Sequence, residues 1–104
     1  MITETARTSE DSYDYIAYDI TADGVTVGTA AVMADARTAY CERIDIDPEF
    51  RNRGHGTAAL RDLSDLHSGL IIAPDNPDAA RLYRRIGTVS TESIYDQGYG
   101  VYEI

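Results

Sequence analysis

The sequence contains no lysine, no tryptophan and only one cysteine. A single cysteine, Cys41, cannot form a disulfide within the chain, which favours a reducing compartment such as the cytoplasm. No apolar run approaches the roughly 18 residues of a membrane-spanning helix, and no basic-then-apolar signal segment opens the chain. No spacing of histidines, cysteines or carboxylates is typical of a metal site. We therefore expect a cytoplasmic protein with no membrane or metal partner.

Positive charge is scarce. Only nine arginines oppose 18 acidic residues, which gives a net charge of −9 in 104 residues. Such a charge repels nucleic acid and anionic membranes, and it favours cationic partners or substrates. A host bias, from a high-GC genome or a salt-rich cytoplasm, explains the same composition equally well. Because arginine is the chain's main cation, a place where arginines gather is where an anion is expected.

The length and the 43% of hydrophobic residues indicate one domain, spanning residues 1–104. Alternating apolar and polar residues, turn residues and helical periodicity together predict its elements. We expect a loose start or short edge strand over 1–12, strands over 13–20, 25–33 and 39–47, a helix over 55–67, a strand over 70–73 buried on both faces, a helix from Pro77 capped by Asn76 and ended by Gly87, and a closing hairpin formed by 88–95 and 99–104. This order predicts an α/β domain of the α+β type: a mixed, mostly antiparallel sheet with two helices packed on it.

The stretch RNRGHGTAAL, residues 51–60, places two glycines and two arginines where the first helix begins. The first turn of a helix leaves backbone N–H groups without partners and carries partial positive charge. Glycines at 54 and 56 let a phosphate approach those amides, and Arg51 and Arg53 add charge. A tight turn in which glycine merely supplies a positive φ is the alternative.

Residues 44–60, IDIDPEFRNRGHGTAAL, resemble the acetyl-CoA-binding segment of the GNAT superfamily of N-acyltransferases. The family pattern Arg/Gln-x-x-Gly-x-Gly/Ala is filled by Arg51, Gly54 and Gly56. A second segment, NPDAARLYRRIG, is similar to the family's Asn-x-x-Ala-x-x-Leu/Phe-Tyr-x-x-x-Gly pattern, through Asn76, Ala79, Leu82, Tyr83 and Gly87. The glycine motif of a dinucleotide-binding site directly follows a strand, in a parallel βαβ unit near the start of the fold. Here a loop separates the glycines from the preceding strand, and antiparallel strands come first, so we set this alternative aside.

The resemblance implies roles for individual residues. Tyr83 matches the family's usual general acid, which protonates the departing CoA thiolate; a core tyrosine is the alternative. Glu42 is the best-placed general base, with Asp45 second, although a solvated carboxylate on a strand is at least as good an interpretation of either. The residues predicted to hold acetyl-CoA are Asp45, Ile46, Arg51, Asn52, Arg53, Gly54, His55, Gly56, Thr57 and Asn76.

One part of the resemblance fails. Most members have a strand and two helices before the segment that begins here near Tyr13, and the dozen polar residues before it are too few for both helices. We therefore expect a short member whose acceptor side is open, or is completed by a second subunit in a homodimer. The predicted activity is transfer of an acetyl group from acetyl-CoA to an amine of a small molecule, peptide or protein. The alternative is an acyl-CoA-binding or interaction module without catalysis.

Overall fold

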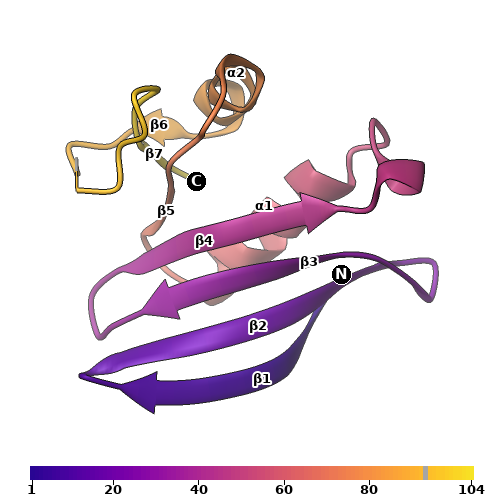
Figure 1. Ribbon diagram of the computed structural model, residues 1–104, viewed down its shortest axis with the longest axis horizontal. Helices are drawn as coiled ribbons and strands as arrows, with labels where there is room; N and C mark the ends of the chain where they lie inside the picture. Colours follow the sequence, from indigo (N-terminus) through magenta and orange to yellow (C-terminus); the bar gives the residue numbers. More distant parts are fainter. Residues whose placement is uncertain (93) are drawn as a thin grey trace.

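The computed structural model describes residues 1–92 and 94–104, and these residues form a seven-stranded sheet with two helices (Figure 1). The sheet order is β1-β2-β3-β4-β5-β7-β6. The elements are β1 (Ile2–Glu10), β2 (Tyr13–Ala22), β3 (Val25–Ala34), β4 (Ala39–Ile46), the 3-10 turn η1 (Pro48–Phe50), α1 (His55–Leu66), β5 (Leu70–Ile72), α2 (Pro77–Ile86), β6 (Thr88–Val89) and β7 (Tyr102–Glu103).

All neighbouring strands are antiparallel except β4 and β5, which pair in parallel. The prediction of a mixed, mostly antiparallel sheet with two helices is therefore confirmed. The three residues of β5 are all buried, as the apolar run over 70–73 predicted. The side chain of Asn76 caps α2 by accepting a hydrogen bond from Ala79 N at 2.8 Å, which confirms that helix start.

The two ends of the chain differ from expectation. The start is neither loose nor short, because a turn with positive φ at Asp11 and Ser12 folds a nine-residue strand β1 back onto β2. Its side chains are exposed on both faces except at Ile2, so no apolar alternation marked it as a strand. The closing hairpin exists, but β6 and β7 have two residues each. The strand expected over 88–95 includes Ser93, which lies outside the described residues.

Both helices pack on the same face of the sheet. Leu60 and Leu63 of α1 share one buried cluster with Ile16 and Cys41 of the sheet and with Tyr83 of α2. In Figure 1, α1 lies behind β4. The connection from β4 through α1 to the parallel strand β5 is expected to be a right-handed crossover, and this handedness decides which face of the sheet α1 covers.

The opposite face, which we call the open face, carries a row of neighbours from four strands. Tyr15, Met33, Tyr40 and Ile71 lie side by side across β2, β3, β4 and β5. Neither of the two helices in the described chain packs on this row. The open face is therefore the side from which a molecule can approach β4 without displacing a helix.

Strand β4 contains a bulge at Glu42. Cys41 pairs with Val32 and Arg43 pairs with Ala31, so Glu42 is one extra residue on β4. The bulge changes the phase of the strand, since Cys41 and Ile44 both point to the helix-covered face although three positions separate them. Glu42 is thereby placed at a bend of the backbone rather than in a regular ladder.

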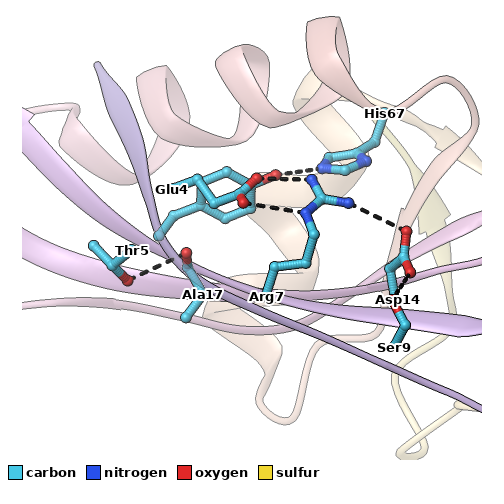
Figure 2. Close-up of polar contacts among 8 residues, drawn as sticks. Glu4, Thr5, Arg7, Ser9, Asp14, Ala17 and His67 are labelled. Atoms are coloured by element: carbon cyan, nitrogen blue, oxygen red, sulfur yellow. Dashed lines mark hydrogen bonds and ion pairs between the residues drawn. The ribbon is translucent and has the colours of Figure 1, made fainter.

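A polar network closes the end of α1 against the first two strands (Figure 2). The Arg7 guanidinium forms ion pairs with the carboxylates of Glu4, at 2.7 Å, and Asp14, at 3.2 Å. Beside it, Tyr18 Oη lies 2.7 Å from Nε2 of His67, the residue that ends α1. Burial, with a smaller contribution from Arg7, lowers the pKa of His67 below 6.5, so the folded state favours the neutral imidazole.

This pKa shift predicts a stability that depends on pH. As the pH falls below about 6.5, the unfolded chain takes up a proton that folded His67 resists, so the free energy of unfolding should decrease. His67→Gln should remove this loss between about pH 7 and about pH 5.5, a window above the titration of most carboxylates. Urea denaturation followed by circular dichroism at the two pH values measures it. Equal losses in both proteins would contradict the prediction.

Candidate active site

Helix α1 begins with backbone amides that no part of the described chain caps. Gly54 is the N-cap residue in a left-handed conformation, φ 82°, which favours glycine, and no side chain caps the helix. The first intrahelical bond joins Ala58 N to Gly54 O at 3.0 Å. The N–H groups of His55, Gly56 and Thr57 therefore precede the helical ladder, and the first turn holds no acidic residue. These amides face the exposed loop 51–54.

The two arginines of this loop have different positions. Arg51 Nε donates to Ile46 O at 2.8 Å, and its guanidinium pairs with Asp45 at 3.3 Å, so Arg51 ties the loop to the end of β4. The Arg53 guanidinium lies 6.0 Å from the centre of the Phe50 ring. Asn52 takes a left-handed conformation, φ 64°, between them. Both arginines are exposed, but the Arg51 guanidinium already pairs with Asp45, so Arg53 is the loop arginine whose charge is available next to the free amides.

A gap opens between β4 and β5. The parallel pairing covers three residue pairs and ends at Cys41 and Ile72, whereas β4 continues to Ile46. Asp47 N donates to Val27 O at 2.8 Å, and a Cβ at Gly28 would collide with Asp45 O. The backbone N–H and C=O groups of Asp45 and Asp47 therefore point toward β3. Because these directions alternate along a strand, Ile44 and Ile46 turn their N–H and C=O groups toward the gap. The carboxylate of Asp45 instead pairs with Arg51.

The two predicted catalytic residues meet at a cavity in this gap. The cavity has a volume of about 160 Å³, and Tyr83 and Glu42 both line it, together with Cys41, Arg43, Ile44, Ile72, Ala73, Pro74 and Asp75. Tyr83 is only 8% exposed, and burial raises its pKa to about 12, with smaller effects of Cys41 and Asp75. Within the described residues its hydroxyl has no hydrogen-bond partner. The arrangement therefore offers a protonated phenol and, at the bulge, an exposed carboxylate.

Sequence reasoning did not place Cys41 in this cavity. The thiol donates to Arg43 O at 3.4 Å, and burial raises its pKa to about 12. The bulge beside it was also missed, although the sequence carries a signal for it. Apolar residues fall at 39 and 41 and then at 44 and 46, and this change of phase is typical of one inserted residue.

Asn76 was predicted both as a helix cap and as a ligand for acetyl-CoA. Its side chain is engaged by Ala79 N and by the Asp75 carboxylate at 2.9 Å, so it serves the start of α2. Its role in binding stays a prediction. Among the described residues, no three histidine, cysteine or acidic side chains gather closely enough to hold a metal ion. None of the described helices has the length and apolar character needed to cross a membrane.

Comparison with known protein families gives one match that covers most of the chain. The family model described as the acetyltransferase (GNAT) family matches residues 2–88. The chain belongs to the GNAT acetyltransferase family. Both glycines of the loop and Tyr83 fall within the matched residues. None of the curated protein sequences matches the chain.

Solved structures of GNAT proteins share this fold. A GNAT family acetyltransferase from Elizabethkingia anophelis, with acetyl-CoA bound, superposes with a TM-score of 0.64 at 16% identity, covering 99% of this chain and 94% of that one. An acyl-CoA N-acyltransferase from Klebsiella pneumoniae gives 0.66 at 24% identity, covering 86% and 70%. A GNAT family protein from Bacteroides thetaiotaomicron gives 0.64 at 21% identity, covering 86% and 59%. The chain thus spans less than two thirds of the Bacteroides protein, and in the residues described here β1 leads into β2 without an intervening helix.

The environment of Cys41 predicts a thiol that does not react in the folded protein. A pKa of about 12 leaves almost no thiolate at neutral pH, and the side chain is only 2% exposed. Iodoacetamide at about pH 8 should therefore modify the native chain far more slowly, on the order of 10²-fold or more, than the chain unfolded in guanidinium. Mass spectrometry of timed samples measures both rates. Equal rates would show that the cavity admits the reagent and leaves the thiol ionisable.

Proposed function

We propose that this GNAT protein transfers the acetyl group of acetyl-CoA to an amine. The observation that carries the proposal is the gap between β4 and β5, where Tyr83 and Glu42 line one cavity. Acetyl-CoA bound to the Elizabethkingia relative supports the choice of donor. In this proposal acetyl-CoA is a substrate, and the acceptor is an amine that meets it at the gap.

The chain offers a complementary surface for each part of the donor. The amides of His55, Gly56 and Thr57, with Arg53 nearby, suit the pyrophosphate because free N–H groups and positive charge favour an anion there. The backbone groups of Ile44 and the N–H of Ile46 suit the amides of the pantetheine arm, which would bond them as an added strand does, whereas Ile46 O already accepts from Arg51. Asn52 and Arg51 shape the loop between these two regions.

The reaction needs two proton transfers that the cavity can supply. The acceptor nitrogen attacks the thioester carbon, so a C–N bond forms and the C–S bond breaks. The nitrogen's proton passes to the Glu42 carboxylate, directly or through water, and the CoA sulfur takes the proton of the Tyr83 hydroxyl. Atoms and charges balance, because Glu42 gains the proton that the neutral amine loses and the leaving sulfur gains the proton of Tyr83. A final proton transfer from the Glu42 carboxyl to the Tyr83 phenolate, through water, restores both groups.

The raised pKa of Tyr83 fits this role. A phenol with a pKa of about 12 is a poor acid toward a thiolate in water, whose thiol has a pKa near 8.5. The same surroundings, however, raise the pKa of the Cys41 thiol to about 12. A thiolate forming in this cavity loses its water in the same way, so its basicity approaches that of the Tyr83 phenolate. Matched acidities favour proton transfer in the transition state.

Donor binding is tested at Gly56. A Cβ there would make only an ordinary contact with Ile46 Cγ1 at 3.8 Å, so Gly56→Asp should fold while placing negative charge against the free amides. Acetyl-CoA should raise the melting temperature of the wild type by mass action and leave that of Gly56→Asp unchanged. Differential scanning fluorimetry measures the shift. Ala36→Asp, the same charge change in the exposed turn before β4, should keep it. A wild type that shows no shift at millimolar acetyl-CoA would overturn the donor assignment.

Catalysis is tested at Tyr83. Tyr83→Phe keeps the buried ring and removes only the hydroxyl, so the acetyl-CoA shift and the melting temperature should change little. Turnover should fall on the order of 10²-fold, the usual contribution of a positioned general acid. Because the pKa of Tyr83 is about 12, wild-type kcat should show no decline between about pH 8 and about pH 10 from loss of its proton. Tyr99→Phe, in an exposed loop, is the matched control.

These experiments also separate the two functional classes. A stability loss in Tyr83→Phe with unchanged turnover would assign the hydroxyl to the fold. Binding of acetyl-CoA without transfer to any of a panel of amines, polyamines and basic peptides would favour the non-catalytic acyl-CoA-binding module.

A further inference from the structure

A second cavity, of about 530 Å³, lies on the open face beside β4. Four cross-strand neighbours contribute to its lining: Met33, Tyr40, Ile71 and Glu103. The Tyr95 ring stacks on Tyr40, with 3.8 Å between ring centres and 8° between planes, and thereby anchors the chain after β6 over the sheet. We call this cavity the tyrosine pocket. Its volume lies in the range of sites for small molecules.

The lining of the tyrosine pocket suits a cation. Tyr13 and the stacked pair of Tyr40 and Tyr95 supply aromatic rings. Asp35, Glu92 and Glu103 supply three carboxylates, against one arginine, Arg37, among the described lining residues. Hydrogen bonds from the backbone N–H groups of Thr38 and Arg37 lower the pKa of Asp35, which keeps it ionised. Aromatic faces and net negative charge both attract ammonium groups.

The tyrosine pocket and the gap between β4 and β5 are neighbours along β4, because Tyr40 lines the pocket and Glu42 follows it two residues later on the same strand. After burial, which is the main cause, the Glu42 carboxylate contributes to the raised pKa of both Tyr40 and Tyr95, so its charge acts on the tyrosine pocket. Glu42 also lines the cavity of Tyr83. Tyr40 and Ile71 lie one residue before Cys41 and Ile72, where the pairing of β4 with β5 ends. The tyrosine pocket and the Tyr83 cavity therefore lie on opposite faces of the sheet, and an amine held in the tyrosine pocket would reach Tyr83 through the gap beyond Cys41 and Ile72.

We propose that the acceptor is an amine carrying a second positive charge, such as a diamine or polyamine, which binds in the tyrosine pocket. This inference rests on the proposed transferase function. The reacting nitrogen must be neutral when it attacks, so it carries no charge to pair with the exposed carboxylates of Asp35 and Glu103. A second ammonium group stays charged and can pair with them, with its alkyl chain against Met33 and Ile71.

Two amines that differ in this one charge test the proposal. The kcat/KM for 1,4-diaminobutane should exceed that for butylamine on the order of tenfold, the factor that one cation–π or ion-pair contact supplies. Glu103→Gln and Tyr95→Leu should each lower that ratio toward one. Asp65→Asn makes the same charge change as Glu103→Gln at an exposed position of α1, and it should preserve the ratio of the two kcat/KM values. A ratio near one in the wild type would overturn the proposal and leave acetyl transfer itself standing.

A binding measurement separates the pocket from the chemistry. In calorimetry with coenzyme A present, 1,4-diaminobutane should bind the wild type several-fold more tightly than butylamine does, and Glu103→Gln should lose this preference. If this result is obtained but no amine is acetylated, the tyrosine pocket is supported and the transferase function fails. Absence of any preference in calorimetry would overturn the tyrosine pocket as the site that binds the second charge.

Discussion

The parallel strands β4 and β5 pair over three residues and then separate, and the other parts of the candidate site are arranged around the gap that this leaves. Backbone N–H and C=O groups need partners, so a gap beside β4 has to be filled by water or by a ligand. The bulge at Glu42 lies where the pairing stops, and the loop before α1 returns to the end of β4 through Arg51. One helix thus begins at the far end of the gap, and the other brings Tyr83 to its inner wall.

Charge is distributed unequally around β4. Arg51 and Arg53 lie in the loop beside the free amides of α1, whereas the open face carries Asp35 and Glu103 beside the tyrosine pocket. In a chain with few cations, the proposed anion site thereby lies near one end of β4 and the proposed cation site lies beside the other. The net charge of −9 is consistent with a cationic substrate, and a composition bias of the host remains an equally good source for the surface charge elsewhere.

Alternation of apolar residues sufficed to predict β2, β3 and β4, because each buries one face. The nine-residue length of β1 was not predicted beyond a short edge strand as one alternative, since both of its faces are exposed and its polar residues show no periodicity. The loop glycines and Tyr83 were predicted from two local segments of the sequence, residues 44–60 and 76–87. The tyrosine pocket had no such signal, because Tyr40 and Tyr95 stack across more than half of the chain. Contacts of that range depend on the assembled sheet.

The bulge at Glu42 also constrains how this sequence can vary in length. With the extra residue, Ile44 and Ile46 point into the core while Arg43 and Asp45 point away from it. Deleting one residue at this position would exchange the two sets and turn a guanidinium and a carboxylate inward. Insertions and deletions should therefore be tolerated in the turns between strands but excluded from this short segment, so that sequences descended from a common ancestor keep the same spacing between Cys41 and Ile44 even where the residues themselves have changed.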